Sequence, residues 1–512
     1  MKLNFSLRTR QKLIISEGIT NAWMPDIRWE LYSEVLNASL GEPNHLYATD
    51  QAGHLQRLRQ LIRENDPDYV IRLAVHLRGQ LYRKELSFIL TAELAAPDGG
   101  ERVSRHMGTI LQTAGEIPEW LGYWALATAK RNGKMMKPGR ALQKSLTEVF
   151  RRLDEYQFTR YSSELQEVMR ATMLLVRPKA KDREQRILFD RILKDQLGAR
   201  STWQMELKAL QEQQYDSIAL KQAMLRDKWK EGISSFRMGY PALLATLRPI
   251  LAAGVSGKVL KLAGDYIGNA AAIARTRQLP FPLLEAYREL RPMPQGGTNL
   301  LLEALEEAAV HSARNIAGFE EDTRVVIAMD VSNSMKYPVS EGSKMQRYDI
   351  GPLLALLLKK KCRSVLMGIF GNGWKPVGLS GKNILAGVEE FRYREGEAGY
   401  GTNGHLVIQD LLKNRRVVDK VMIFTDCRLW DRRQFHQPAG ADLGNLWRQY
   451  KQLAPGARLY LFDLAGSGDE PLQMLKDQVT LVAGWSEGIF DVLAAAEKAG
   501  ETIKQLGGGQ VA

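Results

Sequence analysis

A change of hydrophobic pattern near residue 320 constrains the fold of this 512-residue chain more than any other feature. Before the change, apolar residues recur at helical spacing. After it, short apolar runs alternate with helical segments. Such a chain needs two kinds of core, one made by helices packing on helices and one made by a sheet that helices cover.

The first part of the chain predicts a succession of short helices from about residue 50 to about residue 310. One helix is expected to begin at Asp66-Pro67, a cap residue followed by a proline. Its apolar face would consist of Val70, Leu73, Ala74, Leu77 and Leu81. Further helices are expected at 102–114, 118–132, 139–155, 162–175, 182–196, 202–213, 217–228, 241–252, 257–273, 280–289 and 298–315. Short helices with short connections favour antiparallel pairs stacked as in HEAT-type solenoids, and a globular bundle is the alternative.

The second part predicts a sheet of the α/β type. Strands are expected at 324–330, 363–370, 420–426, 458–464 and 479–483, and helices at 348–361, 404–414, 442–453 and from about 486. Alternation of this kind predicts a parallel sheet covered on both faces. We therefore expect a helical domain over 1–320, an α/β domain over 321–506 and a flexible tail over 507–512.

The formal net charge of +13 is concentrated in the middle of the chain. Residues 101–300 contain 33 basic and 20 acidic side chains, whereas the two flanking parts are balanced. A localised basic surface indicates an anionic partner, most often nucleic acid. A helical domain with many solvated lysines and arginines explains the charge equally well.

Composition excludes several other classes of protein. A hydrophobic content of 45% and a charged content of 25% are typical of soluble globular domains. The two cysteines, Cys362 and Cys427, provide neither a disulfide framework nor a cysteine zinc site. The N-terminus has no secretory signal pattern, and no apolar run reaches the roughly 18–20 residues that span a bilayer. We expect a cytoplasmic protein without membrane contact.

Oxygen-bearing side chains follow three of the predicted strands. Asp330, Ser332 and Ser334 form a D-x-S-x-S pattern after the first strand, Thr402 lies in a glycine-rich loop, and Asp426 ends a later strand. Ligands of such sheets bind beyond the carboxyl ends of the strands. A hard cation such as Mg²⁺ prefers oxygen ligands. The pattern therefore predicts a divalent metal site, and the alternative is a helix cap with turn hydroxyls.

This set of residues resembles the metal-ion-dependent adhesion site of von Willebrand factor A domains. The resemblance implies that Asp330, Ser332, Ser334, Thr402 and Asp426 hold Mg²⁺ or Mn²⁺. It also implies a Rossmann-like fold and a recognition role in which a partner's carboxylate completes the ion shell. Catalysis is not implied.

The order of a helical domain before such a module resembles the Ro 60 kDa autoantigen family, whose helical part is the TROVE domain. The segments that carry the resemblance are 81–95 (LYRKELSFILTAELA), 139–144 (GRALQK), 234–247, 277–288 (RQLPFPLLEAYR) and 484–492 (GWSEGIFDV). The compact chain is most similar to bacterial members. The resemblance implies a monomeric HEAT-like ring that the A domain closes. It further implies binding of small noncoding Y RNAs and of single-stranded 3′ ends of misfolded RNA, in RNA quality control with a 3′ exoribonuclease.

Basic residues between 130 and 183 are the candidates for contact with RNA. If 139–153 is a helix, Leu142, Leu146, Val149 and Leu153 lie on one side and the basic residues lie near the other. The RNA-binding candidates are Lys130, Arg131, Lys134, Lys137, Arg140, Lys144, Arg151, Arg160 and Tyr161. Lysine and arginine would contact phosphates, and the tyrosine could stack on a base.

The family's RNA-binding strip contains a lysine, an arginine and a histidine. Arg160 occupies the lysine position, whereas the arginine position falls near Glu164 and the histidine position falls at 174–176 (LLV). These departures from the family pattern are compatible with phosphate contacts, and they leave open whether the strip keeps contacts with base edges.

Two other functions remain open at this stage. The chain could be a metal-dependent adaptor whose A domain captures a partner's carboxylate. It could also be a metal-dependent nuclease, but the candidate site offers mostly hydroxyls and no second metal cluster. We expect a binding protein and no enzyme.

Overall fold

The computed structural model describes residues 27–38, 52–128, 137–159, 163–194, 196, 203–294, 296–339, 343–378, 383–426, 443–466, 472–486 and 488–508. These residues form two compact units. One unit contains the described residues from Glu206 to Asp491, and the other contains those up to Met205 and those from Val492 onward. The predicted domain boundaries at 320 and 506 stay predictions. The two compact units meet instead between Met205 and Glu206 and between Asp491 and Val492. Residues 509–512 of the predicted tail lie outside the described ranges.

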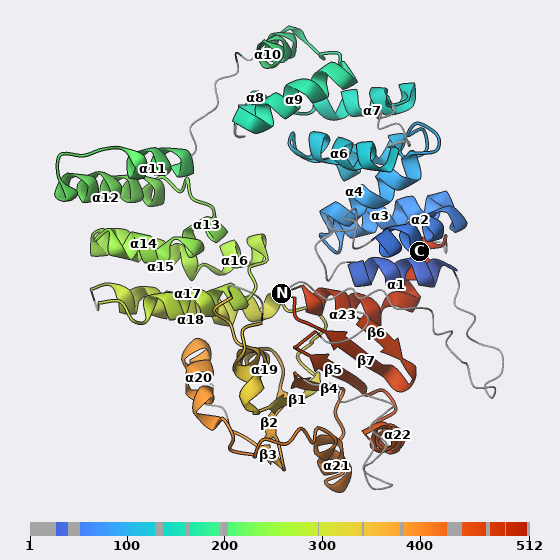
Figure 1. The fold of residues 1–512 in the computed structure, drawn as a ribbon, viewed down its shortest axis with the longest axis vertical. Helices are drawn as coiled ribbons and strands as arrows, with labels where there is room; N and C mark the ends of the chain where they lie inside the picture. Colours follow the sequence, from blue (N-terminus) through green and yellow to red (C-terminus); the bar gives the residue numbers. More distant parts are fainter. Residues whose placement is uncertain are drawn as a thin grey trace. The chain divides into compact units, whose positions relative to one another are not determined.

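The unit that contains the described residues up to Met205 and from Val492 onward is built from helices (Figure 1). They are α1 (Ile27–Ala38), α2 (Ala52–Glu64), α3 (Pro67–Gly79), α4 (Lys84–Ala95), η3 (Ser104–His106), α5 (Met107–Ile110), α6 (Glu116–Thr128), α7 (Arg140–Arg151), α8 (Glu155–Thr159), α9 (Ser163–Val176) and α10 (Arg183–Leu193). α3 begins as predicted, because the Asp66 side chain accepts the backbone N–H groups of Asp68 and Tyr69. Near the C-terminus, α24 (Ala499–Leu506) packs on α1, and the Leu506 carbonyl accepts a hydrogen bond from Arg72 Nε at 2.5 Å.

α11 (Trp203–Glu212) crosses the division between Met205 and Glu206. The helices of the other unit follow it. They are α12 (Ile218–Ser234), α13 (Tyr240–Ala245), α14 (Leu247–Ala252), α15 (Gly257–Ile267), α16 (Ala270–Thr276), α17 (Phe281–Leu290) and α18 (Thr298–Ser312). Within the described helices, none is long and apolar enough to cross a membrane.

Three of the predicted helices are wrong in extent. The helix expected at 241–252 is divided into α13 and α14, because Pro249 has no N–H to donate to the carbonyl of Ala245. The helix expected at 257–273 is divided where Asn269 accepts the N–H of Ala272 at 2.8 Å and so begins α16. The helix expected at 102–114 is reduced to η3 and α5.

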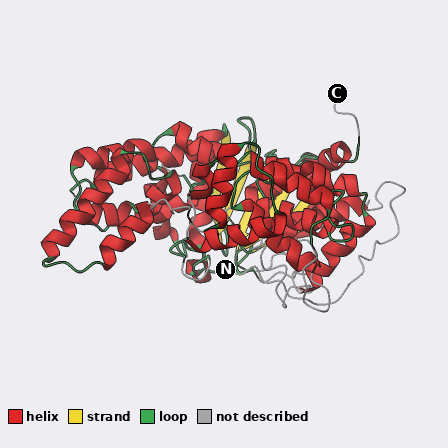
Figure 2. Ribbon diagram, turned by 90° about the horizontal axis from the view of Figure 1, so that it is seen from above, coloured by secondary structure: helices red, strands yellow, loops and turns green. Residues whose placement is uncertain are grey.

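After η4 (Ala313–Asn315) the chain forms a seven-stranded sheet, which is the block of strands in Figure 2. The strands are β1 (Arg324–Asp330), β2 (Ser364–Phe370), β3 (Trp374–Pro376), β4 (Lys420–Thr425), β5 (Arg458–Asp463), β6 (Leu472–Leu475) and β7 (Val479–Ala483). Their order is β3-β2-β1-β4-β5-β7-β6. The five predicted strands are present and mutually parallel.

The sheet departs from the predicted parallel arrangement at its two edges. β3 pairs antiparallel with β2, and β6 pairs antiparallel with β7. Only residues 371–373 separate β2 from β3, and only η7 (Lys476–Gln478) separates β6 from β7. Connections this short can form a hairpin but cannot cross over to a parallel neighbour. The predicted fold class, a helical array followed by a Rossmann-like domain, is confirmed.

Helices cover both faces of the sheet. α19 (Arg347–Lys361) lies against β1 and β2, and α20 (Ile384–Phe391) packs on α19. α21 (His405–Lys413) and α22 (Leu443–Leu453) pack together over a core that includes Trp447 and Tyr450. α23 (Ile489–Glu497) follows the last strand. Burial on both faces explains why the parallel strands have continuous apolar sequences.

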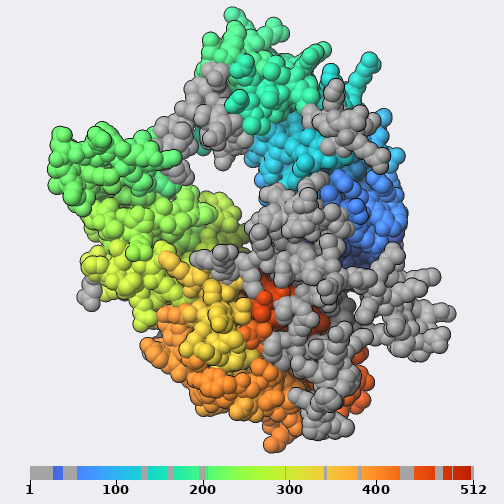
Figure 3. Space-filling model, in the orientation of Figure 1, coloured from blue at the N-terminus to red at the C-terminus, as the bar shows by residue number. Residues whose placement is uncertain are grey.

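The helices α17 and α18 join the sheet through α19 and α20. In Figure 3 the yellow-green, yellow and orange parts of the chain lie against one another. The Glu306 carboxylate of α18 accepts the first three backbone N–H groups of α20 at 2.7, 3.0 and 2.8 Å. These donors have no partner within their own helix, and a carboxylate is favoured at a helix N-terminus. The helical part is thus fixed to the sheet by a helix cap.

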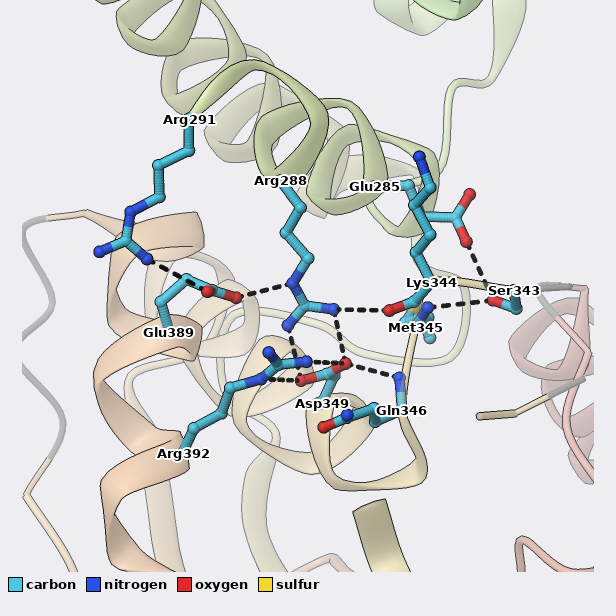
Figure 4. Close-up of polar contacts among 10 residues, drawn as sticks. All are labelled: Glu285, Arg288, Arg291, Ser343, Lys344, Met345, Gln346, Asp349, Glu389 and Arg392. Carbon is cyan, nitrogen blue, oxygen red and sulfur yellow. Dashed lines mark hydrogen bonds and ion pairs between the residues drawn. The ribbon is translucent and has the colours of Figure 1, made fainter. Parts of the chain in front are cut away.

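A buried ion network provides the second attachment (Figure 4). Arg288 of α17 donates to both carboxylate oxygens of Asp349 of α19, each at 2.7 Å, and to Glu389 of α20 at 2.7 Å. Arg392 also contacts Asp349, whose side chain is fully buried. Asp349 in turn accepts the backbone N–H of Gln346 and so caps its own helix. Each charge is paired, which buried charges require.

We expect Arg288→Met to destabilise this unit by about 3–5 kcal/mol, because it leaves a buried carboxylate short of its main partner. The measurement is urea unfolding of the full chain followed by tryptophan fluorescence. The matched control is Arg291→Met. Arg291 pairs with Glu389 but is 56% exposed, so its loss should cost less than about 1 kcal/mol. Equal losses in the two variants would contradict this account of the attachment.

Candidate metal centre and candidate nucleic-acid interface

Asp330 is the central residue of the candidate metal centre. It is the last residue of β1, and its side chain is fully buried. One carboxylate oxygen accepts the N–H of Ser332 at 2.8 Å, and the other accepts the hydroxyl of Thr425 at 2.7 Å. Burial raises the pKa of Asp330 and the nearby Asp426 carboxylate acts in the same direction, while these hydrogen bonds lower it.

The two serines of the D-x-S-x-S pattern lie together directly after this carboxylate. Their hydroxyl oxygens are 3.2 Å apart. Ser332 is 92% buried, and Ser334 belongs to the short helix η5 (Asn333–Lys336) that turns the chain away from the sheet. The turn directs both hydroxyls to the place where Asp330 ends its strand.

Thr402 lies in an exposed loop beside the end of β2, and β2 is one of the two strands that pair with β1. Asn372 Oδ1 accepts the N–H of Gly401 at 2.9 Å, and the carbonyl of Gly371 accepts the N–H of Asn403 at 3.2 Å. A Cβ atom on Gly371 would lie 2.6 Å from the carbonyl oxygen of Ala398, so only glycine permits this approach. The loop therefore places Thr402 at the same edge of the sheet as Asp330.

Asp426 follows β4 directly, on the other side of β1. Its carboxylate lies 3.4 Å from Nη1 of Arg347, and both side chains are largely buried, at 10% and 14% exposure. The chain runs from β1 outward to β2 on one side and returns to β4 on the other. Asp330 and Asp426 thus flank the topological switch point, where such sheets bind ligands.

The residues that the sequence predicted as metal ligands therefore gather at the ends of three adjacent strands. Two carboxylates and three hydroxyls form a set of hard oxygen donors, which suits Mg²⁺ and does not suit a soft metal. No cluster of three or more His, Cys, Asp or Glu side chains suited to a metal occurs among the described residues. The two carboxylates alone would be too few ligands for Mg²⁺, and the three hydroxyls complete the set of donors.

Two residues of this site were missed by the sequence reasoning. Thr425 orients the Asp330 carboxylate, and the sequence FTD contains it next to Asp426. Arg347 lies far from both carboxylates in sequence, and only the placement of α19 brings it to Asp426. No motif in the sequence would have indicated it.

The candidate nucleic-acid interface is centred on α7. The predicted helix is present, and Leu142, Leu146, Val149 and Leu153 are buried. Lys137, Arg140 and Lys144 are exposed, and no hydrogen bond or ion pair joins their side chains to other described residues. Arg151 is partly committed, because it donates to the carbonyl of Lys179 at 2.9 Å and pairs with Glu148.

The remaining RNA-binding candidates cannot be placed. Lys130, Arg131, Lys134, Arg160 and Tyr161 lie outside the described residues. The basic surface that the structure describes is therefore α7 together with the exposed side chains of the segment that follows α9. These are Arg177, Lys179 and Lys181.

We expect Asp330→Asn to abolish stabilisation by Mg²⁺ without destabilising the ion-free protein. Because the pKa of Asp330 is raised in the folded protein, its ionised form costs stability at pH 7, and this cost disappears as the pH falls through that pKa. The asparagine removes the cost together with the ligand charge. The measurement is thermal unfolding with chelator and with MgCl₂.

Asp419→Asn is the matched control at the opposite end of β4. Arg324 holds the pKa of Asp419 below its usual value, so its ionised form stabilises the fold, and this stability is lost as the pH falls. The control should unfold at a lower temperature and keep its response to Mg²⁺. A response to Mg²⁺ that persists in Asp330→Asn would contradict the site.

Comparison with solved structures gives matches at the level of the fold. No protein-family model matches the sequence, and no curated protein sequence matches it. The crystal structure of the Ro (RSR) protein of Deinococcus radiodurans is similar over 86% of this chain and 93% of that chain, with a TM-score of 0.62 and 16% identity. The match spans both the helical array and the sheet, and it confirms the resemblance predicted from the sequence at the level of the fold. The chain has the fold of the Ro protein.

Proposed function

We propose that this chain is an RNA-binding scaffold of the Ro type without catalytic activity of its own. It would bind small noncoding Y-type RNAs and single-stranded 3′ ends of misfolded RNA, and act in RNA quality control in the cytoplasm. The proposal rests on the exposed cations Arg140 and Lys144 of α7, in a chain with the Ro fold.

The arrangement of α7 supports contact with phosphates. Arg140, Lys144 and Arg151 are separated by four and seven residues, so they project from the same side of the helix over about 16 Å. The buried leucines occupy the opposite side, and the basic row therefore faces away from the core. Arg140 and Lys144 are available for an external partner, because neither forms an ion pair with a carboxylate among the described residues.

The segment after α9 extends this basic surface. Arg177, Lys179 and Lys181 are exposed. The hydrogen bond from Arg151 to the Lys179 carbonyl places this segment at the C-terminal end of α7. Phosphate contacts of this kind give affinity that does not depend on sequence and that falls with salt. Degradation of a bound RNA would then require a separate 3′ exoribonuclease.

We also propose that Asp330, Ser332, Ser334, Thr402 and Asp426 hold Mg²⁺ or another divalent cation such as Mn²⁺. The ion would supply a Lewis-acidic position for an oxygen ligand of a partner. Asp330 is buried whereas Thr402 is exposed, so the site opens to the surface on the Thr402 side. This geometry favours a second function, a metal-dependent adaptor that captures the carboxylate of a protein partner.

We expect the double variant Arg140→Ala, Lys144→Ala to weaken binding of a hairpin RNA with a single-stranded 3′ extension about tenfold at physiological salt. The slope of log affinity against log salt should become shallower by about 1–2, since two phosphate contacts are lost. Filter binding over a range of KCl concentrations measures both quantities.

The matched control is Lys360→Ala, Lys413→Ala, which removes the same charge from exposed positions on α19 and α21. Its affinity and salt slope should equal those of the unmodified protein. If the two double variants lose affinity equally, the binding is a property of the net charge and the proposed interface is wrong.

A further inference from the structure

We propose that Arg347 competes with a divalent cation for Asp426 and thereby sets the ion affinity of the metal centre. The inference rests on the proposed metal site and adds to it a residue that is not a ligand. In the ion-free protein Arg347 would act as the counter-charge of the site. An ion could bind only at the expense of this contact.

The position of Arg347 is determined by the backbone. It is the first residue of α19, and its N–H donates to the carbonyl of Tyr337 at 3.0 Å. Its guanidinium lies over the Tyr337 ring, 5.7 Å from the ring centroid, and the side chain is only 14% exposed. The charge is therefore held against the strand ends and does not extend into water.

The contact between Arg347 and Asp426 is incomplete. Nη1 lies 3.4 Å from the carboxylate, which is long for a charged hydrogen bond. Nε is buried and has no hydrogen-bond partner in the described part of the chain. The guanidinium neutralises Asp426 electrostatically, but it does not use the paired geometry that arginine offers a carboxylate.

Asp349, on the same helix as Arg347, forms a complete pair with Arg288 of α17. Arg288 reaches both oxygens of Asp349 at 2.7 Å and also binds Glu389 (Figure 4). Asp349 stands two residues after Arg347. The two contacts therefore differ in kind. The Arg288–Asp349 pair fixes α19 to α17, whereas the Arg347–Asp426 contact leaves the Asp426 carboxylate able to bind another cation.

Electrostatics determines the sign of the effect. A divalent ion at Asp426 would lie within a few ångströms of the guanidinium, and like charges at that distance repel strongly even at an effective dielectric constant of about 20. Arg347 therefore weakens ion binding. In the absence of an ion, the same charge offsets the repulsion between Asp330 and Asp426 and stabilises the fold.

The test compares Arg347→Gln with Arg347→Lys in the full chain. Titration calorimetry with MnCl₂ measures ion affinity, and thermal unfolding in chelator measures ion-free stability. We expect Arg347→Gln to bind Mn²⁺ about tenfold more tightly and to unfold at a lower temperature without ions. Arg347→Lys keeps the charge and should resemble the unmodified protein in both measurements.

The opposite directions of these two effects distinguish competition from structural damage, which would lower stability and ion affinity together. Unchanged or weaker Mn²⁺ binding in Arg347→Gln would overturn the inference. Mn²⁺ binding that survives Asp330→Ala would instead overturn the metal centre itself. If Mn²⁺ binds to Arg347→Gln and does not bind to the unmodified chain, Arg347 excludes the ion completely, and the inference is supported.

Discussion

The parallel pairing of β1 with β4 is the constraint on which the candidate metal centre depends. Its register places Met329 beside Phe424, so Asp330 and Thr425 come next to each other and form a buried hydrogen bond. Asp426 then lies one residue beyond the ladder. A slip by one residue would turn either carboxylate to the opposite face of the sheet. Each strand of the pair is also hydrogen-bonded to an outer parallel strand, β1 to β2 and β4 to β5, so a slip would break those ladders as well.

The same edge of the sheet connects the site to the helical part. α19 begins with Arg347, which contacts Asp426, and two residues later carries Asp349, which Arg288 of α17 binds. α20 is capped by Glu306 of α18. The charges at this junction are paired within the protein. On α7, in contrast, Arg140 and Lys144 are exposed, and neither has an ion-pair partner among the described residues.

The sequence predicts the central strands well, and it locates the candidate ligands at the strand ends, because both depend on local patterns. A continuous apolar run is sufficient to locate β1 at 324–330, and D-x-S-x-S is a contiguous motif. β3 and β6 were missed, since three or four residues with a proline or mixed polarity resemble loops, and their antiparallel direction depends on connection length. Asn269 and Pro249 divide helices whose apolar periodicity continues across them. Arg347 could not be predicted, because its role arises from tertiary placement alone.

The proposed function depends on the binding of RNA to the basic surface around α7. The most direct test is photo-crosslinking of a hairpin RNA that carries 4-thiouridine in its single-stranded 3′ extension, followed by identification of the linked peptides. We expect cross-links in peptides from residues 137–183, and we expect these cross-links to decrease as the salt concentration is raised. Cross-links confined to peptides from the sheet, residues 324–483, would contradict the proposed function.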